Sequence, residues 1–282
     1  MPAAALGLAL LAGGCTLADA PILAPAGPVA LAERDILFRA FAIMMVVAVP
    51  VFVMTFWFAW RYRASGRGRY QRDWDSGWVD AVTWIVPALI VVTVAVHVWI
   101  FTHRLDPYRP LASGAPPLEV EVVAQDWKWL FLYPEHGVAA VNELAFPSNR
   151  PLSLRITSDT VMNAFFIPAL GGQIYAMAGM QTRLNLAADA PGRFVGRNTQ
   201  YSGEGFADQH FATLAMSDTD FAAWVAQARR ALPLDQTAYA ALARPSIAHP
   251  VTYYADPQKG LFDAIVGKYA DAVPHHPQAA LQ

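Results

Sequence analysis

A single cysteine near the N-terminus is the first residue whose type and position could do chemistry. Cys15 is the only cysteine among 282 residues, and the small residues Ala12-Gly13-Gly14 stand directly before it. The apolar run Ala3–Ala12 is too short to cross the roughly 30 Å of a bilayer core, but it has the length of a signal-peptide core. We therefore predict a signal peptide over residues 1–14 and a lipid on Cys15; the alternative is an unmodified cysteine.

The same count limits redox and metal chemistry. With Cys15 alone, no intrachain disulfide can form and no pair of thiolates is available to hold a metal. The formal net charge of −2 gives no basic surface for nucleic acid. A composition of 55% hydrophobic and 15% charged residues favours a protein associated with a membrane.

Two ionisable residues accompany long apolar stretches. Asp80 stands just before one stretch, and His97 lies within it. A carboxylate at a membrane boundary can hydrate and relay protons, so Asp80 is a candidate proton-relay residue. The alternative is a carboxylate that the dipole of a starting helix favours. We expect His97 to be neutral and packed near the outer interface.

The stretches themselves predict two membrane helices. Ala40–Trp60 carries no charge, Ala81–Thr102 has His97 as its one ionisable residue, and each is long enough to span a bilayer. The loop 61–80 between them contains five arginines, and positive charge marks cytoplasmic loops. We therefore expect a helical hairpin over 40–102 in a bacterial inner membrane. The N-terminal segment 15–39, both termini and a large C-terminal domain would lie in the periplasm.

The sequence of the C-terminal domain predicts β-strands followed by helices. Leu118–Val123 and Pro151–Thr157 alternate between apolar and polar residues, which is typical of strands, and together with turn residues they predict a β-sandwich over 118–217. Trp127 and Trp129, two residues apart, are predicted to share one face of a strand.

Beyond the sandwich we expect a helical region, 218–270. It would contain a helix capped by Asp218 and running to Arg230, and a second helix at Leu261–Tyr269. The tail 271–282 is predicted to be disordered.

Four motifs in this domain carry a resemblance to a known family. They are Asp126-Trp127-Lys128-Trp129, Val161–Pro168, Gln173–Met180 and Tyr201-Ser202-Gly203. With the signal peptide and the hairpin, the chain resembles subunit II of the haem-copper terminal oxidases, and closely resembles subunit II of the branch formed by the cytochrome o ubiquinol oxidases. The likeness covers roughly residues 5 to 270. It implies a cupredoxin-like sandwich.

In the cytochrome c oxidase branch of this family, the sandwich holds a dinuclear copper centre through two His, two Cys, a Glu carbonyl and a Met. The resemblance places those ligands at Asn163, Asn198, Gln200, Ser202, Phe206 and Gln209. Copper of this kind needs thiolates and imidazoles, so the centre is expected to be lost. Cytochrome c would then have no metal centre in this domain to which it could transfer electrons. His210, alone in this region, is interpreted as a surface or packing residue.

The resemblance thus implies a membrane α-helical hairpin plus a copper-free cupredoxin-like sandwich with a C-terminal helical appendage. It implies subunit II of a proton-translocating ubiquinol oxidase, a structural and assembly subunit without a cofactor beside subunit I, which would hold haem and copper. Other oxidase subunits, ubiquinol and membrane lipid are the expected partners. Relatives carry a Glu at Asp80, near the mouth of a proton pathway. The alternatives are a copper-bearing cytochrome c oxidase subunit II and a free-standing envelope lipoprotein; ubiquinol and menaquinol are not distinguished.

Overall fold

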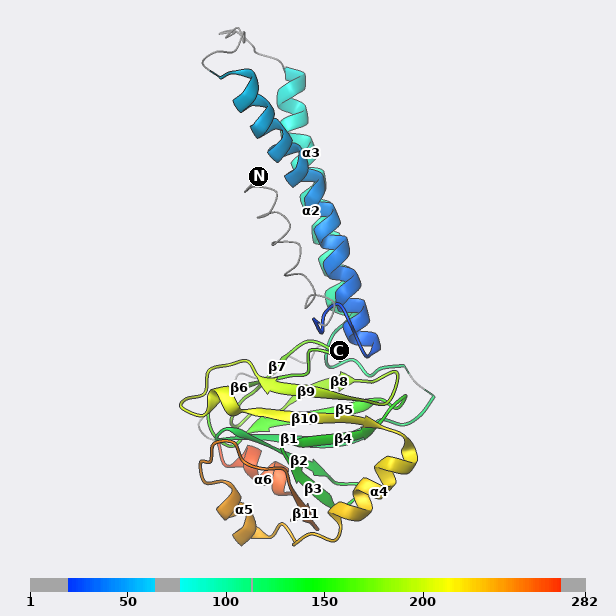
Figure 1. The fold of residues 1–282 in the computed structure, drawn as a ribbon, viewed down its shortest axis with the longest axis vertical. Coiled ribbons are helices and arrows are strands. Elements are labelled where there is room, and N and C mark those ends of the chain that lie inside the picture. The colour runs from blue at the N-terminus through cyan, green and yellow to red at the C-terminus, as the bar shows by residue number, and fades with distance from the viewer. Residues whose placement is uncertain (1–19, 64–76, 113, 270–282) are drawn as a thin grey trace, which may run out of the picture. The chain divides into compact units, whose positions relative to one another are not determined.

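The computed structural model describes residues 20–63, 77–112 and 114–269, so that Cys15 lies outside the described residues. The chain forms two units. A helical unit comprises Arg34–Asp106, and the described residues on either side of it form a sandwich unit. Figure 1 shows both units with their elements labelled.

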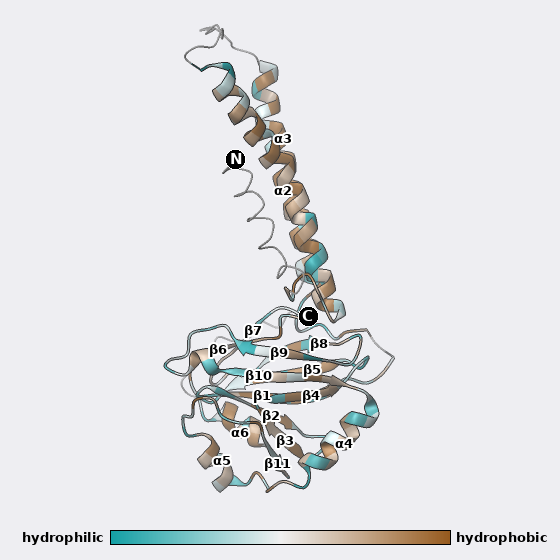
Figure 2. Cartoon of the chain, viewed as in Figure 1, coloured by the Kyte–Doolittle hydropathy of each residue, from teal (hydrophilic) through white to brown (hydrophobic). Residues whose placement is uncertain are grey.

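The helical unit consists of α2 (Pro28–Arg61), whose first residues belong to the sandwich unit, and α3 (Gly77–Arg104). The most apolar stretch of each helix is entirely unburied, and Trp84 in α3 is 78% exposed. Figure 2 shows the apolar colour along most of both helices. Because such surfaces are stable only in hydrocarbon, these are helices for a membrane and not core helices of a soluble domain.

A small cluster joins the two helices. The guanidinium carbon of Arg39 in α2 lies 5.7 Å from the centroid of the Phe101 ring in α3. The ring of His97 lies 4.6 Å from the same Phe101 ring, and its Nε2 is buried with no hydrogen-bond partner within the described part of the chain. His97 is thus packed against an aromatic neighbour.

Two β-sheets form the sandwich unit. The first follows the order β11 (Thr252–Ala255), β3 (Val138–Val141), β2 (Lys128–Tyr133), β1 (Leu118–Gln125), β5 (Leu152–Ser158) and β8 (Thr182–Leu186). The second follows the order β4 (Glu143–Pro147), β10 (His210–Met216), β9 (Gly192–Asn198), β6 (Asn163–Phe166) and β7 (Ile174–Ala176). Neighbours are antiparallel except for β1 with β5 and β4 with β10.

Strand β2 shows how the core is built. Its side chains alternate between two apolar clusters: Trp129, Phe131 and Tyr133 enter the core between the sheets. Leu130 and Leu132 enter a second core on the other face of the same sheet. Every residue of the strand is therefore buried, which explains why its sequence is almost continuously apolar.

The second core is covered by the C-terminal region. It includes α5 (Gln236–Leu242) and α6 (Leu261–Gly267), which supply Leu242, Phe262 and Ile265 to it. Figure 1 shows both helices beside this sheet. Between them the chain forms β11, which pairs with β3 at the edge of the first sheet. The predicted fold class is confirmed, with the addition that the appendage also contributes a strand.

The helix that follows the sandwich, α4 (Asp218–Ala228), is capped one residue earlier in the chain than predicted. Its cap is Ser217, whose hydroxyl accepts the backbone N–H of Asp220. Asp218 is the first helical residue, where its charge suits the helix dipole. The prediction of Asp218 as the cap was wrong because Ser and Asp both suit the position and stand side by side.

The prediction for the tryptophan pair was also wrong. Gln125 pairs with Lys128, so the chain turns within two residues, and Trp127 has a φ of 63° in that turn. Trp129 instead lies within β2 and is fully buried. A tight hairpin turn takes Trp127 off the strand.

The segment that leads into α2, together with the first residues of that helix, is docked on the sandwich. The N–H groups of Ala26 and Ala30 donate to the carbonyls of Ala169 and Leu170, at 2.8 and 3.2 Å. A Cβ on Gly27 would lie 2.0 Å from the carbonyl oxygen of Ala187, so only glycine allows this approach.

Candidate functional site

Four of the six residues that the resemblance places at copper-ligand positions meet in the structure. Asn163 begins β6, Asn198 ends β9, and Ser202 and Gln209 stand on the loop between β9 and β10. We call these four residues the amide cluster. The pairing of Phe165 with Asn198 holds the ends of β6 and β9 together, and the loop closes over them.

Asn198 is the centre of the amide cluster. Its Oδ1 accepts the backbone N–H groups of Ala164 and Gln200, at 2.8 and 3.0 Å. The Nδ2 must therefore point the other way, where it donates to Asn163 Oδ1 at 2.7 Å and to Gln209 Oε1 at 2.9 Å. Both N–H groups of the Asn198 amide and both lone pairs of its oxygen therefore have hydrogen-bond partners. The side chain can be buried at 5% exposure without an unpaired polar atom.

The remaining members complete the network. The Ser202 hydroxyl donates to Gln209 Oε1 at 2.9 Å, and the Asn163 amide donates to the carbonyl of Val161 at 2.8 Å. Asn163 and Gln209 are each 1% exposed. The amide cluster thus ties together the loop before β6 and the loop after β9.

These donor atoms do not suit a copper centre. The cluster offers amide and hydroxyl oxygens that already bind one another, whereas copper of this type selects thiolate and imidazole. Among the described residues, no three His, Cys, Asp or Glu side chains are grouped so that they could hold a metal ion. No redox step can be assigned to these four side chains.

The other two positions are not part of the network. Gln200 contributes its backbone N–H to Asn198, and its side chain is half-buried. The ring of Phe206 lies 5.7 Å from that of Tyr201. Trp127 covers this loop: its indole N–H donates to the Ser202 carbonyl at 3.1 Å, and a Cβ on Gly205 would lie 2.5 Å from its ring.

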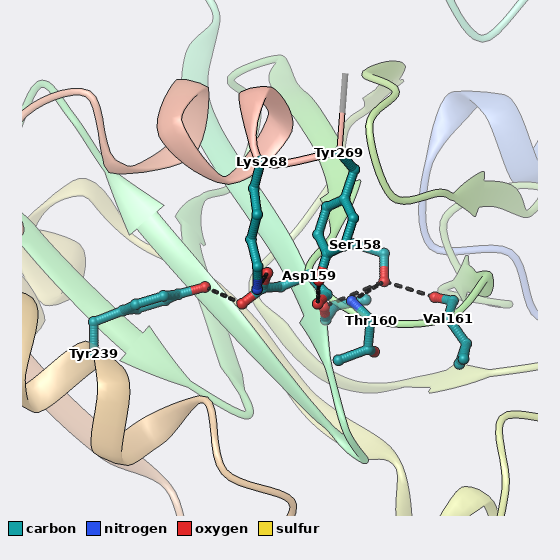
Figure 3. A network of polar contacts seen from close by, with 8 residues as sticks. Ser158, Asp159, Thr160, Val161, Tyr239, Lys268 and Tyr269 are labelled. Atoms are coloured by element: carbon teal, nitrogen blue, oxygen red, sulfur yellow. Dashed lines mark hydrogen bonds and ion pairs between the residues drawn. The ribbon is translucent and has the colours of Figure 1, made fainter. Parts of the chain in front are cut away.

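A second polar network, centred on Asp159, adjoins the amide cluster. Asp159 is 5% exposed and stands four residues before Asn163. Tyr239 donates to its Oδ2 at 2.7 Å and Lys268 to its Oδ1 at 2.8 Å. Figure 3 shows these contacts, with the hydroxyl of Tyr269 donating to the Asp159 carbonyl at 2.7 Å. All three donors come from the C-terminal region, which thereby holds the loop that carries Asn163.

The electrostatics agree with a buried, charge-assisted network. Burial, and then the hydrogen bond to Asp159, raises the pKa of Tyr239. The hydrogen bond to Asp159 raises the pKa of Lys268. Both groups therefore keep their protons at neutral pH and remain donors to the carboxylate.

Two further charged residues attach the C-terminal region to the sandwich. Lys128, fully buried, donates to the carbonyl of Arg244 at 2.8 Å and to Ser246 Oγ at 2.6 Å; burial lowers its pKa. Glu143, 7% exposed, accepts the indole N–H of Trp224 at 2.8 Å and the hydroxyl of Tyr253 at 2.5 Å.

Lys128, Glu143 and Asp159 were not predicted from the sequence to be site residues. A signal for them existed, since each is a charged residue next to or within a run of strand-forming apolar residues. A charge in such a place is rarely buried without a partner. What the sequence could not show is that the partners lie some 80 to 120 residues later in the chain.

The remaining predicted site residues lie elsewhere. Asp80 is exposed in the first turn of α3. His210, at the start of β10, is exposed, and Cys15 lies outside the described residues.

Comparisons with known proteins cover most of the chain. The COX Aromatic Rich Motif family matches residues 231–272, the region that donates to Asp159. The chain is 46% identical over 268 residues to the cytochrome bo(3) ubiquinol oxidase subunit 2 of Pseudomonas putida, covering 94% of this chain and 84% of the relative. It is also 46% identical over 269 residues to the ubiquinol oxidase subunit 2 of Acetobacter aceti, covering 94% and 86%.

A solved structure is similar to part of the chain. The periplasmic domain of subunit II of cytochrome oxidase from Bradyrhizobium japonicum matches 42% of this chain and 98% of its own length, with 24% identity and a TM-score of 0.40.

Proposed function

The chain belongs to the ubiquinol oxidase subunit II family, and from that membership we propose that it serves the oxidase as a structural subunit without a redox centre. The complex oxidises ubiquinol, reduces oxygen to water and moves protons outward. Haem and copper belong to subunit I, and quinol delivers its electrons there directly. The amide cluster is the observation that carries this proposal.

The cluster supports the proposal through its chemistry. Electron entry from cytochrome c would need a metal between the loops before β6 and after β9, and here Asn198 bridges those loops instead. Hydrogen bonds fix the loops without any change in oxidation state. The two loops can therefore hold one arrangement within the assembled oxidase.

The membrane arrangement is part of the same proposal. The chain is anchored in the bacterial inner membrane by α2 and α3, with the arginine-rich loop in the cytoplasm and the sandwich in the periplasm. Residues 1–14 are removed as a signal peptide, and Cys15 carries a lipid. The apolar, unburied surfaces of both helices support this arrangement.

We also propose that Asp80 stands at the mouth of a proton pathway of subunit I. Its exposure in the first turn of α3 supports the proposal, because a carboxylate there can take up protons from water and pass them to a neighbouring subunit.

Purification through this chain tests the function. A C-terminal affinity tag and a mild detergent are expected to bring down a complex with a haem spectrum that oxidises ubiquinol. Reduced cytochrome c should not serve as donor, and metal analysis of the separated chain should give no copper. Two bound copper ions or oxidation of cytochrome c would show a cytochrome c oxidase subunit, and a chain that purifies alone would show a free-standing lipoprotein.

A further inference from the structure

The outer face of β9 carries two cations in an ordered array. Arg193, Val195 and Arg197 alternate with inward residues along the strand, and all three are exposed. On one face of a strand, residues two apart are separated by roughly 6.6 Å. Arg193 and Arg197 thus lie on either side of Val195, an apolar residue that is 51% exposed.

Two open cavities follow this face and share Val195 and His210. One, of about 550 Å³, includes Arg197 and Phe206 in its lining. The other, of about 290 Å³, includes Arg193, His249 and Val251. The two cavities therefore adjoin along β9, and we call them together the β9 groove.

The β9 groove carries an excess of positive charge, with two arginines in its lining against one aspartate. Neither Arg193 nor Arg197 has a salt bridge or a side-chain hydrogen bond to another residue of the described segments. Among the described residues, Asp208 is the one acidic residue that lines either cavity. Free guanidinium groups are strong donors for carboxylates, which they bind through two parallel hydrogen bonds.

The floor of the groove is preorganised. Strand β9 is paired with β10 along Gly192–Arg197 and with β6 at Arg197 and Asn198, which restrains its exposed face. Beneath it, the Phe211 ring packs so closely on Gly196 that a Cβ there would lie 2.0 Å away. A partner would meet a surface already in its binding shape, which lowers the entropic cost of association.

We propose that the β9 groove binds an extended acidic segment of a partner protein. Its carboxylates pair with Arg193 and Arg197, and an apolar side chain between them packs on Val195. The apolar middle distinguishes such a segment from a polyphosphate or an anionic glycan, which would gain nothing from Val195 and Phe206.

A peptide-binding measurement on the detergent-solubilised complex, purified through this chain, tests the proposal. The probe is a fluorescent seven-residue peptide with the sequence Gly-Glu-Thr-Leu-Thr-Glu-Gly, followed by anisotropy at low and at high salt. Saturable binding is expected, weakened by salt because the charges are exposed. The variant Arg193→Gln/Arg197→Gln should bind about tenfold more weakly.

Matched controls separate this site from general charge effects. Arg183→Gln/Arg230→Gln removes two arginines that are also exposed but lie outside the groove, and it should bind as the unaltered complex does. A peptide with Ser in place of Leu should bind more weakly. The proposal is overturned by absence of saturable binding, by equal loss in both double variants, or by equal binding of the Ser peptide, which would indicate a polyanion site.

Discussion

At the scale of single residues, Asn198 holds two loops together through hydrogen bonds, as a metal ion would through its ligands. Its amide joins two backbone N–H groups on one side to two side-chain oxygens on the other. A metal would impose its own coordination geometry, whereas the amide adopts the geometry that the two strand ends already have. The cost of disturbing it is that several buried polar groups lose their partners together.

Asn198→Asp tests this role with almost no change in shape. The carboxylate keeps the acceptor for Ala164 and Gln200 but turns negative charge toward the Asn163 and Gln209 oxygens. We expect a loss of about 2–4 kcal/mol in the free energy of unfolding at neutral pH, measured by tryptophan fluorescence of the detergent-solubilised protein. Repulsion raises the new carboxyl's pKa, so stability should partly return on acidification below about pH 5.

The control for that change is Gln200→Glu. It introduces the same chemistry two residues away, at a half-buried side chain outside the network. It should cost less than about 1 kcal/mol. Equal losses in both variants would mean that Asn198 is not the centre of the cluster.

Tyr253 should make the stability of the fold depend on pH in the alkaline range. Burial, with the hydrogen bond to Glu143, raises its pKa from 10.0 to about 12. The unfolded chain therefore releases this proton first, and the stability that Tyr253 contributes is complete below pH 10.0 and is lost as the pH rises to about 12. Tyr253→Phe should make the alkaline loss of stability shallower in that window, followed by urea unfolding at each pH. Tyr201→Phe, at a 73% exposed ring, should leave the slope unchanged.

The sequence predicted site residues that stand on local motifs, but not contacts that depend on side-chain orientation or on distant parts of the chain. The residues of the amide cluster could be named by resemblance because they stand on recognisable motifs. Their hydrogen bonds could not be named, because these depend on which way the Asn198 amide faces. Asp159 was missed since its donors, Tyr239 and Lys268, stand in another part of the chain.

At the scale of elements, β2 links both cores and the C-terminal region. Its apolar run predicted a strand, and its complete burial follows from the cover of α5 and α6. Sequence periodicity could not predict that cover, because β11 and the helices are short and depend on packing against β2 and β3. The turn at Trp127 was missed for a similar reason, since no Gly or Asn marks it.

Lys128→Met tests the attachment of the C-terminal region. Methionine keeps the volume but leaves the Arg244 carbonyl without its donor, so we expect a loss of about 2–3 kcal/mol. Hydrogen exchange should become faster over residues 244–250 and remain slow in β2. Lys259→Met, at an exposed lysine, is the matched control. Unchanged exchange in the Lys128 variant would mean that packing alone holds the region.

At the scale of the whole molecule, the sequence predicted two membrane helices and a sandwich because each has a strong, regular pattern. The helix α2 starts at Pro28, well before the uncharged stretch. Hydropathy marks only the part that needs lipid, and Pro is favoured in a first helical turn.

Asp80 belongs to this scale because its proposed role requires the assembled oxidase. Asp80→Ala should lower ubiquinol turnover and the number of protons released per electron several-fold in proteoliposomes. Asp80→Glu should retain most of both, because a carboxylate is kept at the boundary. Unaltered values in both variants would leave Asp80 the role of a helix-start residue.

The order of synthesis gives the pairing of β11 with β3 a further consequence. The ribosome makes β3 more than a hundred residues before β11, the strand that closes its edge. Until the last part of the chain has been made, one apolar face of the first sheet and the edge of β3 stay open to water. Such edges invite aggregation and proteolysis. Stalled or truncated products should therefore be destroyed, so that only complete chains reach assembly.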